Sequence, residues 1–251
     1  MLSKNDIKEI KALEQKKFRS ANGLFVAEGH KLVNELLGVF ECVLAAATPE
    51  WDRFGNKIPA ARFEPVTPDE LKRASLLQNP QDVLAVFRIP DHQCQLSTAA
   101  TGNLVLALDD IQDPGNLGTI VRIADWFGIR DIFCSKGTAD IYNPKSVQAT
   151  MGAIARVRLH YIDLKKELES IKGNIPIYGT FLDGENIYSK DLSANGVIIM
   201  GNEGNGISQA IEQTVTDKLL IPAWPTGAKT SESLNVAVAT AIICAEFRRR
   251  N

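Results

Sequence analysis

Gly196-Val-Ile-Ile-Met200 is an apolar strand that leads into a glycine-rich turn, Gly201-Asn-Glu-Gly-Asn-Gly206, and these two segments decide the fold. A second strand, Lys218-Leu-Leu-Ile221, stops at Pro222. A long apolar helix then opens with Ser233-Leu-Asn-Val-Ala-Val-Ala239. Two strand ends and one helix start are therefore expected at the same edge of a sheet, where small ligands usually bind.

Short apolar strands alternate with helical segments through the second half of the chain. Strands are predicted at 104–108, 131–134 and 175–178, and the turn Gln112-Asp-Pro-Gly-Asn-Leu-Gly118 leads into a helix that reaches Phe127. This alternation predicts an α/β fold with a parallel sheet that helices cover on both faces.

The first half of the chain is predicted to form a smaller α/β domain over residues 1–91. A single helix is expected over 7–18, and Gly23 ends it before a strand at 24–27. Residues 92–102 are small, polar and without a period, which is typical of a linker between domains. Residues 103–251 then make the second domain.

Composition excludes several classes of protein. The 251 residues are 45% hydrophobic and 23% charged with a net charge of −2, which is normal for a globular protein and shows no global basic field. No segment has the apolar length of a signal peptide core or a membrane span, so a cytoplasmic protein is expected. The cysteines form no C-x-x-C pair and the three histidines do not cluster with them, so neither a zinc site nor a disulfide framework is expected. The four cysteines are Cys42, Cys94, Cys134 and Cys244.

Two local basic clusters interrupt this balance. Lys16, Lys17 and Arg19 lie near the start, and a run of three arginines, 248–250, lies at the end. Each cluster is either a solvated helix face or a surface that binds RNA phosphates, and the sequence leaves both interpretations open.

Individual motifs in the second domain allow more than one chemistry. Asn116 is a candidate cap for the helix it opens, and Arg122 follows on the same helix, where an arginine near the positive helix start suggests phosphate binding. The glycine-rich turn lacks the G-x-G-x-x-G order of a dinucleotide site, and Gly227-Ala-Lys-Thr230 lacks the full phosphate loop. Ser233 is a suitable N-cap for the last helix. Neither NAD nor a nucleoside triphosphate is supported.

Taken together, the motifs resemble those of the SpoU-type (TrmH-like) RNA 2′-O-ribose methyltransferases of the SPOUT superfamily. The three signature segments are Asn116-Leu-Gly-Thr-Ile-Val-Arg122, Ile199-Met-Gly-Asn-Glu-Gly-Asn-Gly206, and Ile221-Pro222 with Ser233-Leu-Asn-Val-Ala-Val-Ala239. Asn143-Pro-Lys-Ser146 with Thr150-Met-Gly-Ala153 is similar to a fourth family segment. Lys17-Phe-Arg19 and Phe25-Val-Ala-Glu-Gly29 resemble the small RNA-binding domain that many members carry in front.

The resemblance implies a parallel-sheet domain with a deep trefoil knot, S-adenosylmethionine as the cofactor, a homodimer, no metal, and structured RNA as the substrate, ribosomal more than transfer RNA. The implied catalytic residues are Asn116, Arg122, Glu203, Ser233 and Asn235. The implied cofactor-binding residues are Thr180, Gly201, Asn202, Glu203, Gly204, Ile221, Pro222, Leu234 and Asn235. The implied RNA-binding residues are Lys16, Lys17, Arg19 and Arg122.

Two further points qualify the resemblance. The segment from Ala223 to Glu232 is longer than the usual family loop, and Trp224 with Pro225 could stack on adenine or pack locally. A guanidinium is a poor base, so Arg122 is interpreted as a phosphate clamp that stabilises the developing alkoxide, with direct proton acceptance as the alternative. A non-catalytic RNA-binding or assembly protein, and a tRNA or base methyltransferase of the same fold, are the rival functions.

Overall fold

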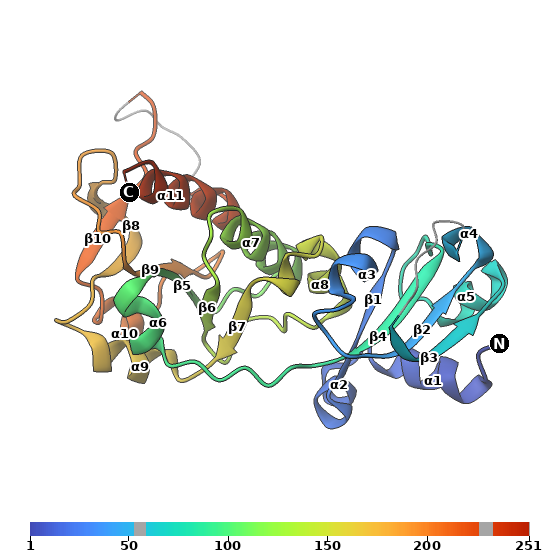
Figure 1. Ribbon diagram of the computed structural model, residues 1–251. Coiled ribbons are helices and arrows are strands. Elements are labelled where there is room, and N and C mark those ends of the chain that lie inside the picture. Colours follow the sequence, from blue (N-terminus) through green and yellow to red (C-terminus); the bar gives the residue numbers. More distant parts are fainter. Residues whose placement is uncertain (53–58, 226–232, 251) are drawn as a thin grey trace. The chain divides into compact units, whose positions relative to one another are not determined.

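The computed structural model describes residues 1–52, 59–225 and 233–250, and the chain divides into two compact units (Figure 1). Unit 1 is Met1–Asp91 together with Asp140–Ala155, and unit 2 is His92–Ala139 together with Arg156–Asn251. This division differs from the expected one, because Asp140–Ala155 lies inside the predicted second domain in sequence but folds with unit 1.

Unit 1 contains a four-stranded mixed sheet in the order β1-β4-β2-β3. Strand β4 runs antiparallel to both neighbours, and β2 pairs with β3 in parallel. The strands are β1 (Leu24–Glu28), β2 (Cys42–Ala47), β3 (Ala60–Pro65) and β4 (Val83–Arg88). The helices are α1 (Lys4–Ala12), α2 (Lys16–Asn22), α3 (His30–Leu36), α4 (Pro49–Asp52), α5 (Pro68–Ala74) and α8 (Pro144–Thr150), with a 3-10 turn η1 (Ala153–Ala155).

Local sequence signals set the ends of the unit 1 helices. Ser3 caps α1 and exchanges hydrogen bonds with Asp6, and Thr67 does the same with Glu70 in α5. Gly23 ends α2 in the left-handed region, at φ +63°. The single helix predicted over 7–18 is wrong, because the chain breaks between α1 and α2.

An aromatic cluster explains why Asp140–Ala155 belongs to unit 1. The rings of Phe25 and Phe87 stack with centroids 5.7 Å apart, and Phe40 meets Phe25 edge-on. Tyr142, which precedes α8, approaches Phe25 at 4.9 Å. The segment thus completes one hydrophobic face of the unit 1 sheet, while α1 and α5 cover the other with Ile10 and other buried residues.

Unit 2 is built on a six-stranded sheet in the order β10-β8-β9-β5-β6-β7, and every strand pair is parallel. The predicted parallel sheet is therefore confirmed. Its strands are β5 (Leu104–Asp109), β6 (Asp131–Cys134), β7 (Arg158–Tyr161), β8 (Ile177–Asn186), β9 (Gly196–Gly201) and β10 (Asp217–Leu220). Its helices are α6 (Leu96–Gly102), α7 (Pro114–Trp126), α9 (Leu164–Ile171), α10 (Gln209–Glu212) and α11 (Val236–Arg250).

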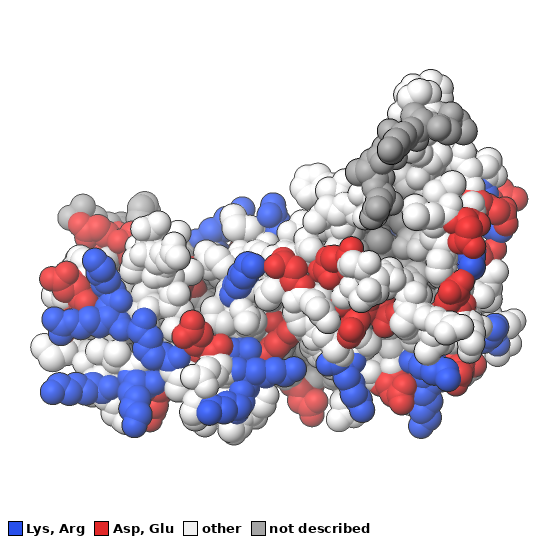
Figure 2. All heavy atoms as spheres, turned by 180° about the vertical axis from the view of Figure 1, so that it is seen from behind, with Lys and Arg blue, Asp and Glu red and all other residues white. Residues whose placement is uncertain are grey.

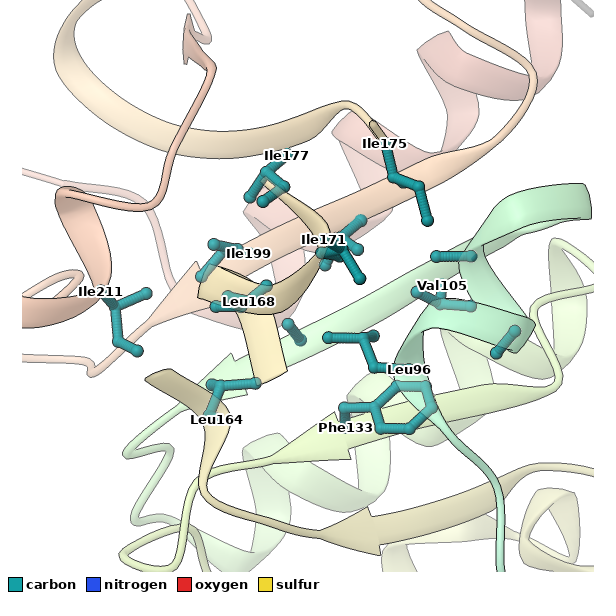
Figure 3. Packing of buried hydrophobic residues seen from close by; sticks show 14 of the residues in the cluster. Leu96, Val105, Phe133, Leu164, Leu168, Ile171, Ile175, Ile177, Ile199 and Ile211 are labelled. Atoms are coloured by element: carbon teal, nitrogen blue, oxygen red, sulfur yellow. The ribbon is translucent and has the colours of Figure 1, made fainter. Parts of the chain in front are cut away.

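Helices cover both faces of this sheet. On one face, α6, α9 and α10 pack against β5, β6, β8 and β9 in a cluster that includes Leu96, Phe133 and Ile199 (Figure 3). Tyr178 in β8 follows Ile177 of that cluster, so it points to the opposite face, where its ring meets Phe247 of α11 at 4.9 Å. Helix α11 packs beside α7 there, as Figure 1 also shows.

Two elements of unit 2 depart from the expectation. The predicted linker 92–102 contains α6, because Leu96, Ala99 and Ala100 are buried in the core despite the small, polar composition around them. Strand β8 continues to Asn186, although its pairing with β9 ends at Gly179 opposite Ile199. Among the described residues, no helix combines the length and apolarity needed to cross a membrane.

Candidate active site

Glu203 lies in the turn after β9 and is held by three donors. The side-chain amide of Asn116 donates to its Oε1 at 3.0 Å, and the backbone N–H groups of Gln112 and Asp113 donate at 3.3 and 3.2 Å. Burial alone would raise the pKa of Glu203, but these hydrogen bonds lower it below its ordinary value. The carboxylate is therefore charged at neutral pH and lies beside the start of α7, where the helix dipole favours a negative charge.

The Asn116 side chain joins this turn to the last helix. While its nitrogen donates to Glu203, its Oδ1 accepts a hydrogen bond from Nδ2 of Asn235 at 3.0 Å. Asn235 also caps α11, because its Oδ1 accepts from the N–H groups of Ala237 at 2.9 Å and Val238 at 3.3 Å. Three of the predicted catalytic residues therefore form one connected chain of hydrogen bonds.

Two capping predictions are wrong. Asp113, not Asn116, is the N-cap of α7, since its Oδ1 accepts from the Asn116 N–H at 2.8 Å and Pro114 takes the first helical position. At α11 the cap is Asn235, and exposed Ser233 lies before the helix. The Asn116 side chain thus takes no part in capping α7, whereas Asn235 both caps α11 and donates to Asn116.

The turn from Gly201 to Gly206 closes on itself. Asn202 and Gly206 exchange two backbone hydrogen bonds of 2.9 Å. The Asn202 side chain accepts from the N–H groups of Gly204 and Asn205 and donates to the Asp110 carbonyl at 2.7 Å. A Cβ at position 201 would lie 2.2 Å from the Gly206 backbone, so only glycine fits there. The Asn202 side chain is thus engaged in shaping the turn.

Arg122 lies in the middle of α7, not in its first turn. Its side chain is exposed, and within the described residues nothing accepts a hydrogen bond from its guanidinium. Six helical residues rotate by about 240°, so Arg122 points about 120° around α7 from Asn116. The argument from the helix dipole fails at this position, but a free, exposed guanidinium is the group that a phosphate needs.

The remaining cofactor candidates are Thr180 within β8, Ile221 and Pro222 directly after β10, and Leu234 just before α11. Thr180 follows the last β8–β9 pair, and its hydroxyl faces the Ile199 carbonyl at 3.5 Å. Ile221 and Pro222 follow β10 and are partly buried, while Leu234 is 48% exposed. Apolar side chains beside strand-end backbone fit an adenosyl group, whose base needs an apolar contact and whose polar edge needs hydrogen bonds. Trp224 is 88% exposed, and the rest of the long loop, 226–232, lies outside the described residues.

Comparisons with known proteins identify the family of the chain. The model of the SpoU rRNA Methylase family matches residues 103–245, and that of the MRM3-like substrate binding domain matches residues 4–85. The chain is 30% identical over 245 residues to the 23S rRNA (guanosine(2553)-2′-O)-methyltransferase RlmP of Bacillus subtilis, covering 96% of this chain and 95% of the relative.

The chain belongs to the SpoU rRNA methylase family. Solved structures agree with the fold of this SpoU methylase along its whole length. A protein of Porphyromonas gingivalis assigned to the TrmH family of RNA methyltransferases superimposes with a TM-score of 0.89 at 39% identity and covers 100% of both chains. An AdoMet-bound rRNA methyltransferase of Sinorhizobium meliloti gives a TM-score of 0.85 at 29% identity, covering 100% of this chain and 96% of the other. The family resemblance drawn from the motifs is confirmed.

The basic residues of the substrate-binding unit of this SpoU methylase differ in accessibility. Lys16 and Lys17 on α2 are exposed. The Arg19 side chain is only 2% exposed; it forms an ion pair with Asp140 at 2.6 Å and donates to the carbonyls of Leu13 and Glu14. Arg19 cannot reach an RNA phosphate in this structure, so that part of the predicted basic cluster is wrong.

The C-terminal arginines are also engaged within the protein. Arg248 donates to the Phe127 carbonyl at 2.8 Å, which ties α11 to the end of α7. Arg249 and Arg250 pair with Glu246, whose side chain is 6% exposed. Figure 2 shows, on the face in view, that Lys and Arg side chains are interspersed with Asp and Glu and do not form one basic field.

Sequence reasoning missed the residues whose hydrogen bonds fix Glu203 and the segment after the glycine-rich turn. The backbone of Gln112 and Asp113 binds Glu203, and the Asp109 carboxylate accepts from the Ser208 N–H at 2.8 Å beyond the glycine turn. Asp113 before Pro114 carried a recognisable helix-start signal. The contact between Asp109 and Ser208 had none, because it depends on the tertiary arrangement of β5 and β9.

Proposed function

We propose that this SpoU methylase transfers a methyl group from S-adenosylmethionine to a ribose 2′-hydroxyl of structured RNA, with ribosomal RNA as the substrate. The Bacillus relative is named for this reaction on 23S rRNA, and the Sinorhizobium structure contains the cofactor. Both are similar to this chain over nearly its whole length. The 2′-hydroxyl is also the group by which proteins distinguish RNA from DNA.

The hydrogen-bonded chain from Glu203 through Asn116 to Asn235 is the observation that carries the proposal. It connects the turn after β9, the start of α7 and the start of α11, all within unit 2. An ionised carboxylate and two oriented amides at the carboxyl edge of a parallel sheet can hold hydroxyl and amino groups in a fixed geometry. Fixed geometry is what a displacement reaction needs, because alignment of the reacting atoms lowers the barrier.

The cofactor would be held by the backbone of the turn from Gly201 to Gly204, by Thr180, and by the apolar side chains of Ile221, Pro222 and Leu234. When bound, S-adenosylmethionine supplies an activated methyl group on a positively charged sulfur. Glu203 would attract the cationic end of the cofactor or accept from a nearby hydroxyl, and Asn116 would keep Glu203 in position. Ser233 would contribute to the geometry of the loop before α11.

Arg122 would bind the RNA phosphate next to the reacting ribose. Its exposed guanidinium can make two parallel hydrogen bonds to phosphate oxygens and stabilise the charge that develops on the attacking oxygen. A guanidinium keeps its proton in proteins, so it is a poor acceptor for the hydroxyl proton. We therefore assign it to clamping and charge stabilisation, with proton removal passing to solvent or phosphate oxygen.

We infer a homodimer, which the position of Arg122 supports. Because Arg122 points about 120° away from Asn116 on α7, one subunit would contribute Arg122 to the site that the partner builds around Asn116 and Glu203. Trp126, one helical turn after Arg122 and 85% exposed, would provide apolar contact area. We also infer that the chain after β10 is threaded as a trefoil knot, which is supported by the position of β9 between β8 and β5 and of α11 beside α7.

Unit 1 would bind the RNA, with Lys16 and Lys17 among the phosphate contacts. Its match to a substrate-binding domain model supports this assignment. Because ribosomal RNA is the proposed substrate, the protein is expected to act in the cytoplasm. The two units would then divide the work, with unit 1 selecting the RNA and unit 2 carrying out the transfer.

The test combines calorimetry with product mapping. The purified chain should bind S-adenosylmethionine and S-adenosylhomocysteine with a stoichiometry near one per chain. With a methyl-labelled cofactor and undermodified ribosomal RNA, label should appear in 2′-O-methyl nucleosides after complete digestion. Label on a base, or label that appears only in tRNA, would replace the proposal with one of the rival enzymes. Absence of cofactor binding both with and without RNA would favour a non-catalytic RNA-binding protein.

A further inference from the structure

A second cluster of reactive side chains lies in unit 2, away from the proposed transfer site. Cys94 precedes α6, Asp131 is the first residue of β6, and His160 belongs to β7. One sulfur, one carboxylate oxygen and one ring nitrogen from these residues all lie within 4.8 Å of one another. Spacing in the sequence did not predict this cluster, because its members come from three separate segments.

The carboxylate and the imidazole are already fixed in place. Nε2 of His160 lies 2.8 Å from Oδ1 of Asp131, and the other oxygen of Asp131 accepts from Arg158 at 2.7 Å. The imidazole also stacks on Phe133, with centroids 4.8 Å apart and planes inclined by 26°. Arg158 and Phe133 lie outside the cluster and hold these two side chains in orientation, as outer contacts do for metal ligands.

The cluster can be reached from solvent. His160 and Asp131 are buried, but Cys94 is only partly buried and lines a surface pocket of about 540 Å³. His92 and His160 line the same pocket. A buried ligand pair with an open third ligand and a path of entry is the arrangement that a small cation requires.

We propose that Cys94, Asp131 and His160 form a binding site for one divalent cation of the zinc class. A thiolate, an imidazole and a carboxylate are together the donor set that Zn²⁺ accepts, whereas Mg²⁺ and Ca²⁺ select oxygen ligands. With Zn–N near 2.0 Å and Zn–S near 2.3 Å, tetrahedral ligand atoms lie about 3.5 Å apart. The cluster reaches that spacing by a small inward movement of Cys94 and a small widening of the contact between Asp131 and His160.

The cation would fasten the start of unit 2 to its sheet. Cys94 lies in the segment that leads into α6, and the two other ligands lie on neighbouring strands at one side of the sheet. Strand β7 is separated from β9, which precedes Glu203, by β5 and β6. The site is therefore independent of the methyl-transfer chemistry, and its role is to hold the first residues of unit 2, which begins at His92, against the sheet of the same unit.

Cobalt(II) is the probe that tests the site on the full chain. After dialysis against a chelator, titration with Co²⁺ should give a thiolate-to-cobalt charge-transfer band that saturates at one ion per chain and disappears when Zn²⁺ is added. The other cysteines, Cys42, Cys134 and Cys244, are buried, so the band would report on Cys94. Cys94→Ser should abolish the band, and His160→Gln should weaken Zn²⁺ binding at least about 100-fold in competition with a chromophoric chelator.

Matched controls separate ligation from folding. His30→Gln removes another histidine that bonds an aspartate, Asp82 in unit 1, and should leave the band unchanged. Circular dichroism checks that each variant is folded, and because Cys94 is partly exposed, Cys94→Ser alone decides the matter if His160→Gln does not fold. The proposal is overturned if stoichiometric Co²⁺ gives no thiolate band, or if the band survives in Cys94→Ser.

Discussion

Asn235 donates a hydrogen bond to Asn116 across 3.0 Å, and this contact connects the first turns of α11 and α7. The Asn116 amide can accept it only while its nitrogen points to Glu203, so one side chain sets the orientation of the other two. Its orientation is thus determined by the network and not by helix capping. Among the three residues of this network, Asn116 should therefore be the most sensitive to substitution.

Asn116→Asp should reduce methyl transfer by roughly 10²-fold, the loss expected when a reacting group is displaced by about 1 Å. The new carboxylate would face the carboxylate of Glu203. The two negative charges would repel each other, and the new side chain could no longer donate a hydrogen bond to Glu203. Single-turnover transfer to ribosomal RNA measures the loss. Asn116→Ser, which removes the bond without adding a charge, should lose less activity, and equal loss in the two variants would contradict the repulsion.

Arg122→Ala should lower single-turnover transfer by roughly 10²–10³-fold, as loss of one transition-state hydrogen-bond donor does elsewhere. Cofactor affinity by calorimetry should stay near normal, since the guanidinium makes no contact within the described residues of its own chain. Arg122→Lys keeps the charge but loses the two-pronged geometry, so it should retain an intermediate rate. Full turnover in Arg122→Ala would remove this residue from the mechanism.

Mixing two inactive variants tests whether the site is shared between subunits. In a dimer of one Arg122→Ala subunit and one Asn116→Asp subunit, one of the two shared sites has both native residues. Random exchange makes half of the dimers mixed, so about a quarter of the wild-type rate should return. Light scattering of the mixture confirms the dimer. If both residues serve the same subunit, mixing restores nothing.

The fold was largely predictable, because its signals are local. The alternation of apolar strands with helices predicted the parallel sheet, and the turn at 112–118 predicted the helix that forms as α7. The assignment of Asp140–Ala155 to unit 1 was not predictable, since it depends on Tyr142 reaching Phe25. Helix α6 was missed for the same reason: only its burial against the sheet shows that its alanines form a packed face.

The candidate site was predictable only as a set of motifs. The resemblance identified Asn116, Glu203 and Asn235 but could not say that they bond to one another, because the three are brought together by the tertiary fold. It also assigned Arg19 to RNA. Arg19 is instead buried in an ion pair with Asp140. The sequence of a basic cluster does not show which of its arginines are exposed and which are buried in ion pairs.

Arg19→Ala should therefore act on stability. Removing the guanidinium leaves Oδ2 of partly buried Asp140 and two backbone carbonyls without the donor that Arg19 supplies, which should lower the free energy of unfolding by about 3–5 kcal/mol. Urea unfolding measures the change. Asp140→Asn should lose less, because its amide can still accept a hydrogen bond from Arg19. A loss below about 1 kcal/mol in Arg19→Ala would show that the pair is solvated.

The double variant of Lys16→Ala with Lys17→Ala should act on RNA affinity and leave stability unchanged. Each phosphate contact that is lost should lower the slope of log affinity against log salt by about 1. Filter binding at several salt concentrations measures the slope. The matched control replaces two exposed residues of α5, Lys72→Ala with Arg73→Ala, and removes the same charge elsewhere on unit 1. Equal effects of the two double variants would mean that the overall electrostatic field of unit 1 attracts RNA, and not direct phosphate contacts by Lys16 and Lys17 on α2.

Glu203→Gln should lower transfer roughly 10–100-fold, because a hydrogen bond to a charged group contributes about 1.5–3 kcal/mol.

The pH dependence of the transfer rate gives the sharper test of Glu203. Hydrogen bonds from Asn116 and the backbone outweigh burial and hold the pKa of Glu203 below its ordinary value, so the charged form persists to lower pH. A carboxylate whose pKa is lowered in the folded protein gives its full stabilisation above its ordinary pKa, about 4.3. That stabilisation is lost as the pH falls through the lower pKa of the folded state. The ratio of wild-type to Glu203→Gln rates should therefore be constant from about pH 5.5 to 8. A ratio that declines between about pH 7 and 5.5 would mean that burial prevails and that the Asn116–Glu203 bond does not stabilise the charge.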